Sequence, residues 1–356
     1  MIVYGVVLGI TSLAYIWLRH GLHFEKSRVD RITISIFFIA YLLLLCLRDV
    51  SVGVDTKTYV WRFQQLQMMD WKSALSYSGK GDEFAFILLN KMIGSIGGPR
   101  LLIIISAMLI VIPIMRLYRD EAEGAVFTIS FFLVSLLFGM FFSGMRQSIA
   151  IAMAVPAYYF TKKRKIIPFL LMVILAFLFH RTGIVIAAIY PIYHAKITRK
   201  WLWFVVPIMT VVYLYRDALF EYLFVLAGDS YVRGYSYLTG TSAQGALMIL
   251  FLLLSVYSYI VLDEEQAGEE EIGLRNILLL AACIHLFTPV NSIVARINMY
   301  YILFIPVAIT RINNRCRENY YQITRIASFI MSAYFVLHFL TSTGSSVQFE
   351  NYRFFF

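Results

Sequence analysis

Long apolar runs, separated by short charged or turn-forming stretches, extend along the whole chain. A helix of about 20 apolar residues spans the ~30 Å hydrocarbon core of a bilayer. The pattern therefore predicts an all-α fold, a polytopic membrane bundle of about 12 transmembrane helices. The predicted helices cover residues 1–18, 32–47, 101–118, 125–142, 147–160, 166–179, 183–195, 201–216, 243–262, 274–290, 297–312 and 323–341.

Short basic stretches predict the side of the membrane on which each loop lies. Lys and Arg gather in 19–31, 161–165, 196–200 and 311–325. Clustered basic residues in short loops are typical of the cytoplasmic side. Alternation then places both ends of the chain outside, with two larger outer loops at 48–100 and 217–242. Within the first of these loops, the apolar stretch 84–96 is short for a span, which indicates a re-entrant or interfacial helix.

Composition agrees with a membrane protein and excludes a soluble enzyme. Hydrophobic residues make up 60% of the chain, charged residues 15%, and the mean hydropathy is +0.74. Soluble proteins have about 45–50% apolar and about 25% charged residues. We therefore expect residues 1–356 to form a single polytopic domain whose partner is the lipid bilayer. The net charge of +10 follows largely from helix orientation, so we expect no nucleic acid partner.

Four arginines mark predicted outer helix ends, namely Arg48, Arg146, Arg181 and Arg296. A guanidinium is always charged, and its planar fork grips a phosphate or carboxylate through two hydrogen bonds. Several such groups at one membrane face favour a shared anion site. The alternative for each residue is interfacial snorkelling, in which the stem lies in lipid and the charged head in water.

Asp55 opens a segment in which Tyr59, Phe63 and Leu66 recur at helical spacing. This spacing predicts an amphipathic outer helix lying on the bundle. The Asp55 carboxylate is a candidate for activating a hydroxyl group. Its alternative is a structural role as the N-cap of that helix.

Two further groups are candidates for proton transfer. Glu83 precedes the apolar stretch of the first outer loop, and His180 ends a short apolar run, which places it near membrane depth. Ionisable groups at that depth are functional candidates. The alternatives are a solvated loop edge for Glu83 and a packed, hydrogen-bonded ring for His180. Because the sequence shows neither metal-ligand spacing nor a nucleotide-binding motif, we expect no metal and no cofactor.

Five segments carry a more specific signal through their order. They are 48–63 (RDVSVGVDTKTYVWRF), 82–90 (DEFAFILLN), 142–150 (FSGMRQSIA), 176–182 (AFLFHRT) and 296–301 (RINMYY). In this order the set resembles the motifs of EpsG-type proteins, the Wzy-like bacterial polysaccharide polymerases that make O-antigen, capsule or exopolysaccharide. The resemblance covers residues 48–301, most of the chain.

The resemblance implies a fold of the GT-C glycosyltransferase type in the bacterial plasma (inner) membrane. It implies an enzyme that transfers a polyprenyl-diphosphate-linked glycan, with undecaprenyl as the carrier, to the terminal sugar hydroxyl of another lipid-linked repeat unit. The active site would face the extracytoplasmic side. A chain-length regulator and a flippase are further expected partners.

The predicted roles follow from charge and from the motifs. Phosphate groups need cations, and acceptor activation needs a base. The diphosphate ligands are Arg146, Arg181 and Arg296, with Arg48 in reserve. The candidate bases are Asp55, then His180, then Glu83. The residues for sugar binding or positioning are Tyr59, Gln147 and Tyr300.

A transporter or flippase for lipid-linked oligosaccharides is the alternative function. Its cavity would also be cationic. Such proteins tend to have inverted repeats and broken helix pairs in matching positions. The sequence shows no matched halves, and its polar residues gather at one membrane face, which favours the polymerase. A non-catalytic assembly subunit is a third hypothesis.

Overall fold

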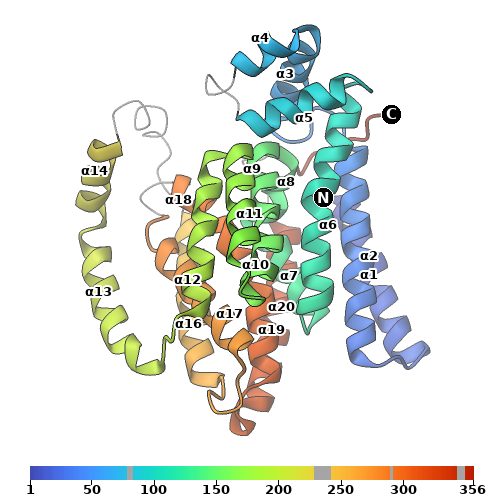
Figure 1. Ribbon diagram of the computed structural model, residues 1–356. Coiled ribbons are helices and arrows are strands. Elements are labelled where there is room, and N and C mark those ends of the chain that lie inside the picture. Colours follow the sequence, from blue (N-terminus) through green and yellow to red (C-terminus); the bar gives the residue numbers. More distant parts are fainter. Residues whose placement is uncertain (78–82, 228–241, 289–291, 343–348) are drawn as a thin grey trace. The chain divides into compact units, whose positions relative to one another are not determined.

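The computed structural model describes residues 1–77, 83–227, 242–288, 292–342 and 349–356 (Figure 1). Within these ranges, regular secondary structure is helical apart from two isolated β-bridges, Arg48 with Phe354 and Leu262 with Cys316. The predicted all-α class is therefore confirmed for the described residues. Most of the predicted outer loop 217–242 lies outside them.

The chain divides into two compact units, each described here by itself. The first comprises Met1–Ala187 and Arg325–Phe356, and the second comprises Ala188–Thr324. Helices of the first unit are α1 (Ile2–Ile16), the π-helix η1 (Trp17–Gly21), α2 (Lys26–Leu47), α3 (Thr56–Met68), α4 (Trp71–Ser76), α5 (Phe84–Gly94), α6 (Pro99–Glu121), α7 (Ala125–Val134), α8 (Leu136–Ser143), α9 (Met145–Ala152), α10 (Ala154–Lys162), α11 (Ile166–Phe179), the 3-10 helix η2 (Arg181–Ala188) at its boundary, and most of α20 (Tyr321–Thr341). Helices of the second are α12 (Ile189–His194), η3 (Arg199–Trp201), α13 (Leu202–Leu214), α14 (Arg216–Ala227), α16 (Ser242–Val261), α17 (Glu269–His285), α18 (Ser292–Ile302), α19 (Ile305–Asn314) and η4 (Glu318–Tyr320).

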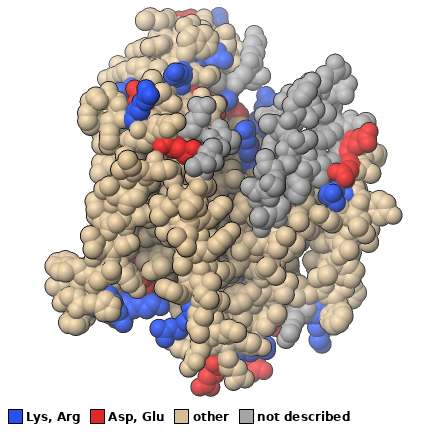
Figure 2. All heavy atoms as spheres, turned by 180° about the vertical axis from the view of Figure 1, so that it is seen from behind, with Lys and Arg blue, Asp and Glu red and all other residues tan. Residues whose placement is uncertain are grey.

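Several helices have the length and hydropathy needed to cross a membrane. Four qualify singly: Ile2–Gly21, Lys26–Leu47, Pro99–Glu121 and Glu318–Thr341. The number rises to 6 among the described residues if two bent pairs, α7 with α8 (59°) and α18 with α19 (41°), each count as one span. Figure 2 shows one face of the molecule, on which Lys and Arg (blue) and Asp and Glu (red) form small groups among side chains of other kinds. The chain is a membrane protein, whereas twelve spans and a GT-C architecture stay predictions.

Proline explains where two of the apolar runs break. Pro156 lies in the first turn of α10, and Pro306 lies in the first turn of α19. A proline ring has no N–H to donate and collides with the carbonyl four residues earlier. Those earlier residues are Ala152 and Ile302, the last residues of α9 and α18. Pro156 and Pro306 therefore account for the two breaks.

Three helices of the region 48–100 gather at one end of the first unit, namely α3, α4 and α5 (Figure 1). As the apolar stripe predicts, α3 buries Tyr59, Phe63 and Leu66. The 11 residues of α5 rise only about 16 Å at 1.5 Å per residue. This helix is therefore too short to span a bilayer alone. Lys91 of α5 secures the end of α3 by donating to the carbonyl oxygens of Leu66 (3.1 Å) and Met69 (2.6 Å).

Candidate functional site

Glu83 lies between an arginine and a histidine that come from two other helices. Its Oε2 accepts a hydrogen bond from Nη1 of Arg146 at 2.8 Å, and its Oε1 lies 2.8 Å from Nδ1 of His180. Glu83 precedes α5, Arg146 lies in the first turn of α9, and His180 follows the last residue of α11. The three side chains keep 13%, 24% and 26% of their surface exposed. The cluster therefore joins three sequence motifs and stays partly exposed.

The charge of Glu83 fixes which nitrogen of His180 carries a proton. Burial raises the pKa of the Glu83 carboxyl, but the hydrogen bond with His180 and the charge of Arg146 outweigh burial, so the pKa lies below its ordinary value. Glu83 is therefore ionised near neutral pH and can only accept hydrogen bonds. Consequently Nδ1 of His180 carries the proton, and in the neutral ring Nε2 is the free acceptor.

Asp55 occupies the N-cap position of α3 without capping it. Its carboxylate makes no hydrogen bond to the first turn of the helix. Oδ2 instead accepts a hydrogen bond from the Ser143 hydroxyl at 3.0 Å, and the Asp55 N–H donates to the same hydroxyl oxygen at 3.3 Å. The Asp55 side chain is exposed. Its contacts thus link the start of α3 to the end of α8, where Ser143 lies.

The turn 48–56, which leads into α3, rests on the Phe142 carbonyl group at the end of α8. The Phe142 oxygen accepts hydrogen bonds from the Arg48 guanidinium at 2.6 Å and from the Thr56 hydroxyl at 3.2 Å. Gly53 has φ +89°, and a Cβ atom there would lie 1.9 Å from the same oxygen. Only glycine fits this backbone position, because it lacks a Cβ and accepts positive φ.

Arg48 has different surroundings from those that the sequence predicts. It is 2% exposed, and besides the Phe142 oxygen it bonds the carbonyl oxygen of Phe141 at 3.3 Å. Its guanidinium therefore holds the turn against α8, and its part as a reserve phosphate ligand stays a prediction. The sequence does not reveal these contacts, because a charge at a helix end does not show whether backbone carbonyls surround it.

The other predicted residues of the first unit differ in exposure. Tyr59 is 8% exposed, with its ring centre 5.8 Å from the Arg146 guanidinium carbon, and Gln147 is buried. Because both side chains are buried, positioning is the role that stays predicted for them, rather than stacking of the Tyr59 ring on a sugar. Arg181 begins η2 immediately after His180, and its side chain is exposed, without a partner among the described residues.

Arg296 and Tyr300 lie on α18 in the second unit. The Arg296 side chain is exposed, whereas Tyr300 is fully buried. Because Tyr300 is buried, positioning is the role that stays predicted for it, rather than direct contact of its ring with a sugar. The same helix carries Asn298, whose amide donates to the carbonyl oxygen of Ala281 at 2.9 Å. The exposed arginine is thus fixed to a helix that is itself bonded to α17.

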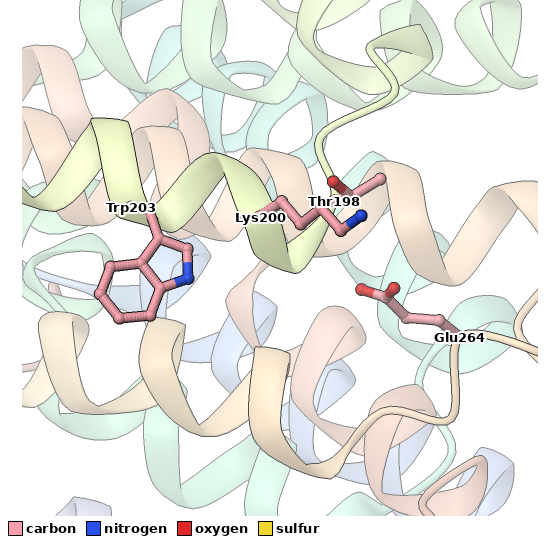
Figure 3. A pocket seen from close by; sticks show the side chains of 4 residues that line it. All are labelled: Thr198, Lys200, Trp203 and Glu264. Carbon is pink, nitrogen blue, oxygen red and sulfur yellow. The ribbon is translucent and has the colours of Figure 1, made fainter.

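The second unit also has a pocket that contains none of the predicted site residues. Its volume is about 470 Å³, and it is lined by Thr198, Lys200, Trp203 and Glu264 (Figure 3). Glu264 accepts a hydrogen bond from the buried Arg275 at 2.6 Å. In the part of the chain that the structure describes, no group of three or more His, Cys, Asp or Glu residues is arranged to hold a metal ion.

Sequence comparisons give one family and no individual relative. The model described as the EpsG family matches residues 31–354. No curated protein and no solved structure matches the chain. The matched range contains the whole cluster of Glu83, Arg146 and His180, together with the turn that rests on Phe142.

Proposed function

The chain belongs to the EpsG family, and from this premise we propose that it polymerises polysaccharide from lipid-linked repeat units. Family membership supports a membrane-bound polymerase of polysaccharide biosynthesis in general. In the proposed reaction, a glycan moves from polyprenyl diphosphate, with undecaprenyl as the carrier, to the terminal sugar hydroxyl of a second lipid-linked unit. The reaction takes place at the extracytoplasmic face of the bacterial plasma membrane, in a bundle of the GT-C type.

The chemistry of this transfer sets what the site must supply. The acceptor oxygen bonds to the anomeric carbon of the donor glycan as the bond between that carbon and the phosphate oxygen breaks. The polyprenyl diphosphate leaves with the electron pair, so negative charge grows on its phosphate oxygens. Preorganised cations stabilise such charge best where little water is present. The hydroxyl proton must pass to a base.

Arg146 and Arg181 are the proposed diphosphate ligands of the first unit. Glu83 keeps the Arg146 guanidinium at a partly exposed position on α9. Arg181 follows His180 directly in the chain and has an exposed side chain. A guanidinium held by one carboxylate still presents further N–H donors to a phosphate. Arg296 of the second unit stays a predicted ligand.

His180 is the proposed base, with Glu83 as its positioning partner. The observation that carries the proposal is the Glu83 carboxylate, whose two oxygens contact Arg146 and His180. When a carboxylate holds one nitrogen of a histidine ring, the orientation of the ring is fixed, and the other nitrogen is the one that can act as the base. Asp55, exposed and bonded to Ser143, is the second candidate base.

The test is incubation of the purified protein with synthetic lipid-diphosphate repeat units. We expect a ladder of lengthened products, and about 100-fold less product per unit time from Arg146→Lys, because Lys lacks the planar fork. Arg116→Lys is the matched control, since Arg116 is an exposed residue of α6 paired with Asp120. Substrate that stays unchanged but crosses the bilayer of liposomes would contradict the polymerase and favour the transporter.

Metal independence is part of the proposal. Arginine supplies the positive charge that a divalent cation supplies in metal-dependent glycosyl transfer. Polymer formation should therefore continue in EDTA. Polymerisation that stops in EDTA and returns with a divalent cation would refute this part of the mechanism.

A further inference from the structure

The segment 349–356 folds back along the first unit and contacts the turn before α3. The Phe355 N–H donates to the Leu47 carbonyl oxygen at 3.1 Å, and the Asp49 N–H donates to the Arg353 carbonyl oxygen at 2.8 Å. The Tyr352 hydroxyl donates to the carbonyl oxygen of Leu44 at 2.8 Å. These bonds join the segment to the last turn of α2 and to the first residues of the turn.

Arg100, in the first turn of α6, binds the end of α2 and the start of the same turn. Its guanidinium donates to the Arg48 carbonyl oxygen at 2.7 Å and to the carbonyl oxygen of Cys46. The guanidinium carbon also lies 3.7 Å from the ring centre of Phe355. A guanidinium at this distance from the face of an aromatic ring is attracted by the ring's quadrupole. Arg100 thus holds α2 and the segment 349–356 together.

The segment also contacts the helix end on which the turn rests. The Phe349 ring stacks on the ring of Phe142, with centres 5.9 Å apart and planes 24° apart. Its carbonyl oxygen accepts a hydrogen bond from the Tyr4 hydroxyl at 2.6 Å, which fixes it to α1. Phe142 is the residue whose carbonyl oxygen binds Arg48 and Thr56. The segment therefore supports both sides of the contact between the turn and α8.

The geometry points to a positioning role for 349–356, which we call the strap, in the proposed transfer. The strap and Arg100 hold the turn 48–56 on the Phe142 carbonyl. That turn places Asp55 against Ser143, two residues before Met145, where α9 begins. Arg146 lies in the first turn of α9. Loss of the strap should therefore loosen the turn and misplace the cationic cluster, without removing any group that touches substrate.

The test compares five proteins, which are the full chain, a chain lacking 349–356, Phe349→Ala, Phe349→Tyr and the control Phe356→Ala. Phe349→Tyr keeps the stacked ring and should behave as the full chain. Phe356→Ala is the matched control, because Phe356 is 84% exposed and its recorded ring contacts are with Phe354 and Phe355. A folded Phe349→Ala protein keeps the proposal testable if the shortened chain does not fold.

Hydrogen exchange at the amides of Val52, Asp55 and Thr56 is the first measurement. These amides bond within the turn or to Ser143, and none bonds the strap directly. We expect exchange at all three to quicken by about tenfold or more when the strap or the Phe349 ring is lost, because local opening becomes easier. Unchanged exchange at the turn would overturn the proposal, whatever the activity.

Polymerisation kinetics are the second measurement, and only this one rests on the proposed function. We expect kcat to fall about 10- to 100-fold, as for misplacement by about 1 Å, while KM for the lipid-linked donor stays within about twofold. A higher KM with unchanged kcat would contradict positioning. A full-length protein that makes no polymer would refute the proposed function, and hydrogen exchange would still decide the role of the strap.

Discussion

At the scale of single residues, Glu83 shows how a partner changes the meaning of a charged side chain. By itself, a carboxylate before an apolar helix is most simply a solvated loop edge. Its 2.8 Å contacts with Arg146 and His180 instead make it the group that orients a candidate base and a candidate phosphate ligand. These partners lie 63 and 97 residues away in the chain. Local sequence patterns carry no information about contacts at such a separation.

The lowered pKa of Glu83 predicts how acid weakens the folded protein. A carboxyl whose pKa is depressed on folding stabilises the fold above its unfolded value, and that stabilisation is lost as the pH falls through the lower folded value. The ordinary value is 4.5, and the folded pKa of Glu83 lies below it. The difference in melting temperature between the original protein and Glu83→Gln should therefore be constant near neutral pH and shrink below about pH 4.5. Asp217→Asn is the control, because the Asp217 side chain is 75% exposed. A difference that grows in acid would contradict the assignment.

At the scale of elements, the pattern predicts helices better than the joints between them. The stripe of Tyr59, Phe63 and Leu66 predicts the buried face of α3, since helical spacing is a local property. Pro156 similarly accounts for the end of α9. The sequence does not predict the joint between the turn and α8, because its centre is the backbone carbonyl of Phe142, which no residue type reveals. Gly53 was the available signal, since a glycine within a motif points to positive φ or close approach.

Gly53 provides the prediction for this joint. Gly53→Ala forces a Cβ atom to within 1.9 Å of the Phe142 oxygen at φ +89°, so the turn must move off α8. We expect a loss of at least about 2 kcal/mol in the free energy of unfolding, from strain at a disallowed φ together with the overlap. Gly9→Ala is the matched control, because a Cβ atom at this α1 residue would meet no atom within 4 Å and alanine favours helix. Denaturant or thermal unfolding in detergent measures the stability of both variants. Equal stability of the two would contradict the close approach of Gly53 to the Phe142 oxygen.

At the scale of the whole chain, hydropathy predicts an all-α membrane protein with about twelve spans, and the structure confirms the class but not that number. Each predicted apolar run falls on helical residues within the described ranges, yet only four to six candidates reach the length and composition of a span. The difference arises because prolines, bends and 3-10 segments divide the runs, as in α9 with α10. A bundle can use such interrupted helices at membrane depth when protein surrounds the freed backbone groups. Twelve spans and a single membrane domain thus stay predictions.

Sidedness is the property on which the location of the site depends. Basic residues in 161–165 predict the cytoplasmic side, and alternation places α3 outside. The three native cysteines are first changed to serine. Lys57→Cys, at an exposed position of α3, should then react in intact cells with a maleimide that cannot cross membranes. Lys163→Cys, which is also exposed, should react only after the cells are made permeable. The reverse pattern would place the cluster of Glu83, Arg146 and His180 on the cytoplasmic side. Reaction of both residues in intact cells would show instead that the number of crossings between α3 and α10 is even.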